Sequence, residues 1–264
     1  MEMLQVCSEY LTDREYEVYW FELGGLRRAI GRDLGLSDGM KILDVGTGWG
    51  LFAIEMAKLF RKGEVVGIDI TPEVDTARKF TKRYEVADIV EILKTDATNL
   101  CFLSDSFDLA VSFLGMRDIH MTRGEKGVEK AVQEMIRVTK LGGRIALCIT
   151  PPEDMETQDQ RLAVEVEGEV FGAKSLPKEF YMNIFQDNHV KLTKTKAYHT
   201  RKKLTAHQVR VELEEGIAIA RRVYNRNVPD FEDVWREYGE RIETFGYGMY
   251  SKIILLVGKK SARS

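Results

Sequence analysis

Residues 41–50 read KILDVGTGWG, and this stretch decides the fold. Apolar and β-branched residues dominate Ile42–Val45, which predicts a short buried strand. The glycines that follow favour a tight turn through which a ligand can approach the backbone: Gly46, Gly48 and Gly50. Residues 51–61 then place apolar side chains at helical spacing and stop before Gly63, so the chain should leave the turn as a helix.

A strand, a glycine turn and a helix together predict a nucleotide-binding unit, because a helix N-terminus offers unpaired N–H groups and a partial positive charge. A dinucleotide fingerprint, G-x-G-x-x-G, would need its third glycine at position 51, where this chain has Leu51. The spacing Asp44-x-Gly46-x-Gly48-x-Gly50 instead resembles the first motif of class I S-adenosylmethionine-dependent methyltransferases. In that family the acidic residue helps to hold the amino group of the methionine moiety.

The following segments extend this resemblance across residues 41–150. Residues 64–70, EVVGIDI, predict a second buried strand whose terminal Asp69 can accept hydrogen bonds from both ribose hydroxyls of an adenosine. Thr71 and Pro72 are expected to begin the next helix, with Thr71 as its cap. Residues 89–93 predict a third strand, and the Asp96–Ala97 pair after it resembles the family's adenine-binding pair.

Two more strands complete the family order. FDLAVSF, residues 107–113, is similar to the family's fourth strand, behind which substrate and cofactor meet. RIALCIT, after Gly142 and Gly143, gives the fifth. The resemblance implies S-adenosyl-L-methionine as the cofactor, no required metal, and a cofactor site made of these residues: Asp44, Gly46, Thr47, Gly48, Gly50, Asp69, Ile70, Asp96, Ala97 and Phe113.

The resemblance also implies the architecture. We expect a doubly wound α/β fold with a Rossmann-like, seven-stranded sheet in the order 3-2-1-4-5-7-6 and an antiparallel seventh strand. Residues 1–264 would form a single methyltransferase domain with three parts: an N-terminal helical cover over 1–40, a cofactor-binding core over 41–150, and a substrate-side half over 151–264.

The stretch between the fourth and fifth strands closely resembles the ubiquinone and menaquinone biosynthesis C-methyltransferases and their small-molecule relatives. Thr122 and Glu125 fit a capping box, which predicts a helix from about Arg123 to Lys140 and a loop over Gly115–Met121. His120 in that loop is the candidate general base, because imidazole titrates in a suitable pH range. A solvated or helix-capping histidine is the alternative.

Two segments outside this core each have two possible roles. In the N-terminal cover, Tyr16, Tyr19 and Trp20 could form an aromatic lid near the sulfonium or simply pack in a core. Between the sixth and seventh strands, residues 205–245 predict two amphipathic helices where family members commonly have a short turn. These helices could roof the acceptor pocket, or they could bury their apolar faces in a homodimer.

Composition narrows the function classes. The net charge of −3, from 39 basic and 42 acidic residues, gives no nucleic-acid footprint. The three cysteines lack metal-ligand spacing, so we expect reduced thiols. No apolar run has transmembrane length, and we therefore expect a cytoplasmic protein that binds no membrane. Methyl transfer to a small molecule is the predicted function. An RNA or protein methyltransferase and a non-enzymatic cofactor-binding protein are the alternatives, and the sequence names neither the acceptor nor its methylated atom.

Overall fold

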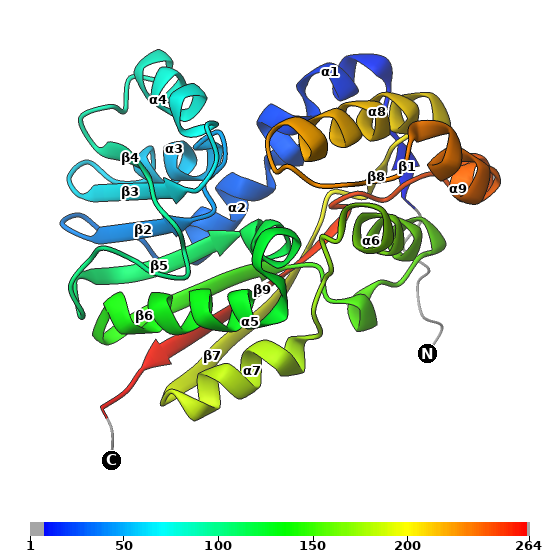
Figure 1. The fold of residues 1–264 in the computed structure, drawn as a ribbon. Helices are drawn as coiled ribbons and strands as arrows, with labels where there is room; N and C mark the ends of the chain where they lie inside the picture. The colour runs from blue at the N-terminus through cyan, green and yellow to red at the C-terminus, as the bar shows by residue number, and fades with distance from the viewer. Residues whose placement is uncertain (1–7, 263–264) are drawn as a thin grey trace, which may run out of the picture. The chain divides into compact units, whose positions relative to one another are not determined.

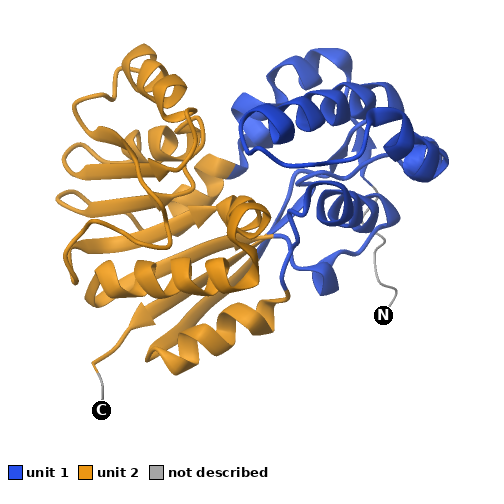
Figure 2. Cartoon of the chain, in the orientation of Figure 1, with its two compact units in different colours: residues 1–26, 150–176, 197–253 blue, residues 27–149, 177–196, 254–264 orange. Residues whose placement is uncertain are grey.

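The computed structural model describes residues 8–262 of the chain. Its elements form two compact units, each assembled from segments that are far apart in the sequence (Figure 2). Unit 1 comprises residues 1–26, 150–176 and 197–253, and unit 2 comprises residues 27–149, 177–196 and 254–264. The chain therefore passes between the units several times instead of completing one before starting the other.

The main sheet has seven strands in the spatial order β4-β3-β2-β5-β6-β9-β7 (Figure 1). The strands are β2 (Lys41–Val45), β3 (Glu64–Asp69), β4 (Val90–Lys94), β5 (Phe107–Phe113), β6 (Thr139–Ile149), β7 (Val190–His199) and β9 (Lys252–Lys260). Neighbours from β4 to β6 pair in parallel, whereas β9 runs antiparallel to β6. Numbered along the chain within this sheet, the order is 3-2-1-4-5-7-6, which confirms the predicted fold.

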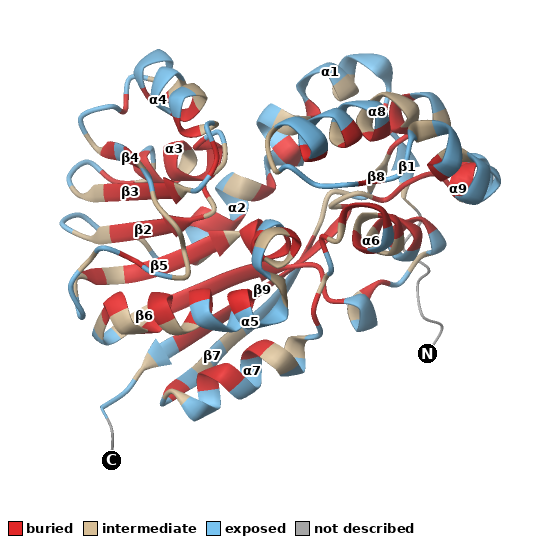
Figure 3. Cartoon of the chain, viewed as in Figure 1, coloured by how far each residue is buried: buried red, intermediate tan, exposed pale blue. Residues whose placement is uncertain are grey.

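The central strands are buried on both faces, as expected for parallel strands that helices cover (Figure 3). Side chains of β2, β3, β5 and β6 supply much of the core of unit 2: Ile42, Leu43, Val65, Ile68, Leu109, Val111, Ile145 and Leu147 are each no more than 1% exposed. These are the apolar runs that predict the strands, so the local pattern and the tertiary burial agree.

The helices of the sheet-bearing part are α2 (Leu26–Asp33), α3 (Leu51–Ala57), α4 (Val74–Arg83), α5 (Gly115–Val138) and α7 (Lys178–Asp187). α3 is shorter than the sequence predicted, because the chain turns at Lys58 and does not continue to Arg61. The predicted cap at Thr71 is also wrong. Its N–H and hydroxyl both donate to Asp69 Oδ1, at 3.0 and 2.9 Å, and α4 begins only at Val74.

The predicted loop over Gly115–Met121 is wrong as well, because α5 starts immediately after β5. Leu114 adopts a left-handed conformation that turns the chain into the helix. Thr122 does not cap a new helix, since its hydroxyl donates back to the carbonyl of Asp118 at 3.0 Å. The helix is instead interrupted at Gly124, whose φ of 67° and ψ of −173° are available to glycine and to few other residues.

Unit 1 contains β1 (Glu9–Tyr10), α1 (Asp13–Glu22), α6 (Gln158–Phe171), β8 (Lys202–Lys203), α8 (Ala206–Arg222) and α9 (Phe231–Phe245). The capping box of Thr205 with Gln208 is present as predicted. β1 and β8 pair in parallel as a small second sheet that the sequence analysis did not predict. In residues 8–262, no helix combines the length and the apolar character that crossing a bilayer requires.

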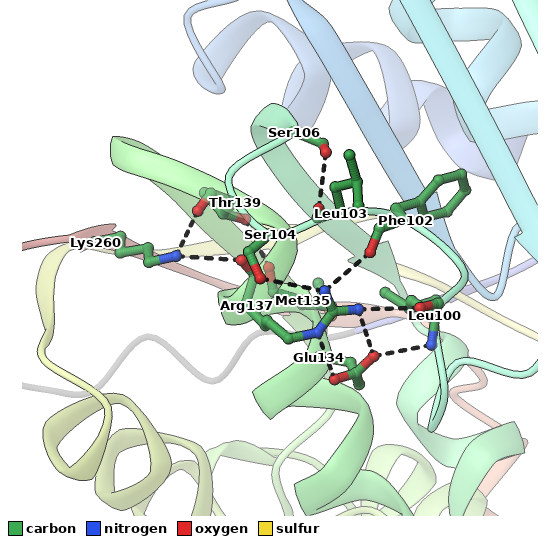
Figure 4. Close-up of polar contacts among 10 residues, drawn as sticks. All are labelled: Leu100, Phe102, Leu103, Ser104, Ser106, Glu134, Met135, Arg137, Thr139 and Lys260. Carbon is green, nitrogen blue, oxygen red and sulfur yellow. Dashed lines mark hydrogen bonds and ion pairs between the residues drawn. The ribbon is translucent and has the colours of Figure 1, made fainter.

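A polar network anchors the segment before β5 (Figure 4). The Arg137 guanidinium donates to both carboxylate oxygens of Glu134 at 2.8 Å and to the carbonyls of Leu100 and Phe102 at 3.0 and 2.9 Å. Glu134 in turn accepts the N–H of Leu100 at 2.9 Å. The network ties α5 to the segment that leads from Asp96 and Ala97 into β5.

Candidate functional site

The glycine turn is shaped by close backbone contacts at the carboxyl ends of β2 and β5. Gly46 and Thr47 both donate their N–H groups to the carbonyl of Ile68, at 3.0 and 2.9 Å. A Cβ at Gly46 would lie 3.0 Å from the Cα of Gly115, so the two glycines pack backbone to backbone. At Gly48, with a φ of 51°, a Cβ would meet nothing within 4 Å, which leaves open space on that side of the turn.

Asp44 is a buried carboxylate that forms no ion pair with a described residue, although the charge of Arg27 acts on it. It is 1% exposed, and its Oδ2 accepts a 2.7 Å hydrogen bond from the hydroxyl of Thr47, which explains why Thr47 is buried in the turn. No described residue hydrogen-bonds to Oδ1. Burial raises the pKa of Asp44 to about 7, and the charge of Asp69 adds to the effect; the Thr47 hydrogen bond, the backbone N–H of Ala53 and the Arg27 guanidinium oppose it.

Asp69 ends β3 and faces the same turn. Its Oδ2 accepts the N–H of Gly48 at 2.9 Å, while Oδ1 accepts both donors of Thr71. The carboxylate is half-buried, and Ile70 beside it is 36% exposed. The structure therefore brings Asp44, Asp69 and the glycine turn together, as the sequence predicted.

Asp96 lies in the segment after β4 and already has partners for both oxygens. Oδ1 accepts the N–H and the hydroxyl of Thr98 at 2.9 and 2.8 Å, and Oδ2 accepts from Arg123 at 2.9 Å. The Thr98 and Arg123 contacts lower the pKa of Asp96 although partial burial opposes them. Sequence reasoning did not single out Arg123, because it lies 27 residues from Asp96 and no local pattern marks the pair.

Phe113 is half-buried at the end of β5, with its ring centroid 4.9 Å from that of Phe52. The Arg27 guanidinium lies 5.3 Å from the centroid of the Phe113 ring, and its positive charge lowers the pKa of Asp44. The sequence analysis did not select Arg27. The one local signal is a pair of adjacent arginines, Arg27 and Arg28, soon after Gly24 and Gly25.

His120 is carried by the first part of α5, five residues after the glycine that contacts Gly46. It is half-buried and sits on a helix, not in the predicted loop. Because His120 lies on a helix that follows β5 directly, its position relative to the end of β5 is fixed more firmly than it would be in a loop. Its role as a base stays a prediction.

The residues present fit a cationic, hydroxyl-bearing ligand such as S-adenosylmethionine. Asp44 offers a buried oxygen that accepts no hydrogen bond within the described part of the chain, which suits an ammonium group. Asp69 is a half-buried carboxylate beside the open side of the turn, which suits hydroxyl donors. Every one of these groups belongs to unit 2.

Comparison with known proteins relates the middle of the chain to methyltransferases. Residues 42–143 match the model of a family described as a methyltransferase domain. A demethylmenaquinone methyltransferase from Desulfitobacterium hafniense is 30% identical over 123 residues, which are 46% of this chain and 46% of that protein. The chain thus spans about half the length of the curated relatives it matches.

Solved structures share the fold at low identity. The [4+2]-cyclase SpnF superposes with a TM-score of 0.63 and 18% identity, covering 91% of this chain and 81% of that one. A geranyl diphosphate methyltransferase superposes with a TM-score of 0.57 and 13% identity, covering 89% and 77%. Because one of these proteins is described as a cyclase, the shared fold alone does not decide the reaction.

Proposed function

We propose that this chain, which carries a methyltransferase domain in the class I S-adenosylmethionine-dependent fold, is an enzyme that methylates a small-molecule acceptor. The observation that carries the proposal is the pairing of Asp44 and Asp69 around the glycine turn, with one buried oxygen of Asp44 accepting no hydrogen bond from residues 8–262. The domain match supports the reaction class, and these carboxylates support a ligand that carries an ammonium group and hydroxyls.

The bound cofactor would supply a methyl carbon activated by a sulfonium leaving group, so the protein has to bind, orient and exclude water. Asp44 would accept hydrogen bonds from the amino group, and Asp69 from the ribose hydroxyls. Asp96 would need to accept from the adenine at an oxygen that already binds Thr98 or Arg123. Thr47, Ile70, Ala97 and Phe113 complete the proposed cofactor site. In the reaction itself, His120 would take the proton from an attacking acceptor atom.

The acceptor class rests on the relatives and on the insertion. Because the relative named above is a demethylmenaquinone methyltransferase, demethylmenaquinone is the first acceptor to test. Helices α8 and α9 are proposed either to determine the acceptor or to form a homodimer interface. Sedimentation of the purified protein distinguishes these roles, since a monomer would exclude the second. We also propose that the protein is cytoplasmic.

Binding and transfer assays test the proposal in two steps. Calorimetry should show that S-adenosylmethionine binds and that a nicotinamide dinucleotide does not, and preference for the dinucleotide would refute the cofactor assignment. The protein is then incubated with methyl-labelled donor and, in separate reactions, with a metabolite extract, total RNA or a protein extract. Label in a small product supports the proposed acceptor class; label only in RNA or protein points to the macromolecular alternative, and donor binding without any labelled product points to a non-enzymatic binding protein.

A further inference from the structure

Unit 1 holds a carboxylate that accepts hydrogen bonds from two aromatic side chains and that the proposed methyl transfer does not use. We call it the Glu212 cluster; it consists of Tyr16 and Trp20 on α1, Glu212 on α8, and Tyr250. The Tyr16 hydroxyl and the Trp20 Nε1 donate to the same oxygen of Glu212, Oε1, at 2.7 and 2.8 Å. Tyr16 and Trp20 are four residues apart, so one face of α1 presents both donors.

Glu212 has no positive partner among residues 8–262. Both of its hydrogen bonds end on Oε1, and Oε2 accepts none from a described residue. The side chain is half-buried, and the charged neighbours that act on it most strongly, Glu215 and Glu167, are both negative. Burial is the main reason that the pKa of Glu212 is raised. A negative charge in such surroundings is stabilised by a cation.

Trp20, which donates to this carboxylate, belongs to a group of packed aromatic rings. The Trp20 ring lies 5.7 Å from the Tyr250 ring at an interplanar angle of 80°, and 5.3 Å from the Tyr19 ring at 66°. Ring faces attract cations, and organic ammonium groups are bound by aromatic side chains of this kind. An inorganic divalent ion is a poorer fit, because it needs several oxygen ligands and the described residues contain no group of three metal-binding side chains.

We propose that the Glu212 cluster binds an organic ammonium ion, either a protonated amine or a quaternary ammonium. Glu212 would supply the counter-charge through Oε2, while Trp20 and Tyr250 would contact the alkyl groups around the nitrogen. The proposal concerns unit 1 alone and does not depend on the methyl transfer proposed for unit 2. It also differs from a purely structural role, in which the two hydrogen bonds only join α1 to α8.

Tetramethylammonium chloride is a suitable probe, with tert-butanol as a neutral analogue of similar shape and sodium chloride as the ionic-strength control. The indole N–H resonance of Trp20 is followed by NMR during each titration. We expect a saturable shift with tetramethylammonium and none with the other two. Equal shifts with tert-butanol or sodium chloride, or no shift with any of them, would overturn the proposal.

Variants separate binding from structure. Glu212→Gln keeps an acceptor oxygen for Tyr16 and Trp20 but removes the charge, and it should weaken binding about tenfold or more. Glu214→Gln, at an exposed position on the same helix, should leave binding unchanged. Tyr250→Leu removes a ring without touching Glu212 and should also weaken binding, which keeps the test valid if Glu212→Gln fails to fold. If a folded Glu212→Gln protein binds tetramethylammonium with unchanged affinity, the proposal is wrong and the cluster only joins α1 to α8.

Discussion

At the scale of single residues, Asp44 combines a cost in stability with a use in binding. Its carboxylate is buried, one oxygen has no partner in the described structure, and its pKa is raised to about 7. An ionised group in that position disfavours folding until a cation neutralises it. The proposed ammonium group of the cofactor would do so, and binding and folding stability are therefore linked through this residue.

Asp44→Asn should make the protein more stable at pH 8 by about 1 to 3 kcal/mol while weakening S-adenosylmethionine binding. In the native protein the pKa is above its ordinary value of 3.8, so the folded state retains a proton that the unfolded chain releases. The Asp44 contribution to the free energy of unfolding should thus fall as pH rises from about 4 to about 7 and stay constant above. Urea denaturation across this range checks it; an equally steep pH dependence in the variant would contradict the assignment.

His120→Ala tests the proposed base. Turnover should fall about a hundredfold, the usual scale for loss of a general base, and the pH dependence of the rate should flatten. Affinity for S-adenosylmethionine should not change, because none of the proposed cofactor contacts comes from this side chain. His207→Ala, at an exposed position on α8, is the matched control. Unaltered turnover in the His120 variant would mean that another residue accepts the proton, or that the acceptor needs no base.

At the scale of elements, the start of α5 and the glycine turn support each other. Gly115 begins the helix, and a Cβ there would lie 3.0 Å from the carbonyl of Val45 and 3.1 Å from the Cα of Gly46. The helix can therefore start at the end of β5 only if position 115 has no side chain. The geometry of the cofactor turn depends on a residue almost seventy positions away.

Gly115→Ala should push the turn out of place, lowering stability by about 1 to 3 kcal/mol and weakening S-adenosylmethionine binding. Gly168→Ala on α6 is the control, because a Cβ there would make only ordinary contacts, the nearest at 3.6 Å. Calorimetry gives the affinity and thermal unfolding gives the stability. If both alanine variants bind the cofactor like the parent protein, the contact of Gly115 with Gly46 does not shape the site.

The Arg137 network is a second coupling between elements. Arg137→Ala should lower the free energy of unfolding by about 3 kcal/mol, because it leaves Glu134, which is 7% exposed, without its charged partner. Arg236→Ala, which removes only an exposed ion pair to Asp233, should change it by less than about 1 kcal/mol. Chemical denaturation measures both. Equal losses of stability in the two variants would mean that the burial of Glu134 does not increase the cost of breaking its ion pair.

At the scale of the whole molecule, the proposed cofactor residues and His120 all belong to unit 2, whereas the Glu212 cluster and helices α8 and α9 belong to unit 1. Hydrogen exchange with S-adenosylmethionine should therefore show increased protection at residues 44–50, 69–71 and 96–97. Tetramethylammonium should instead protect the α1 and α8 segments. Protection of the same peptides by both ligands would contradict the assignment of the two sites to different units.

Local sequence determined the elements and much of the cofactor turn. The glycines of the turn, the apolar runs of β2, β3 and β5, and the Thr205–Gln208 capping box each depend on residues that are close in sequence, so the sequence alone reveals them. Resemblance to a known family supplied the strand order. The same local reasoning failed at Thr71, whose hydroxyl donates to Asp69 two residues before it, and at Thr122, which lies inside a helix that already begins at Gly115.

Tertiary structure decided the properties that depend on distant neighbours. The raised pKa of Asp44 comes from burial among strands that are not adjacent in sequence, and Arg27 reaches Phe113 and Asp44 only through the fold. Glu212 meets Tyr16 across 196 positions of the chain. Burial and electrostatic fields sum over all surrounding atoms, whereas sequence patterns report only on residues within a turn or two; the chain alone could therefore specify the elements but not these environments.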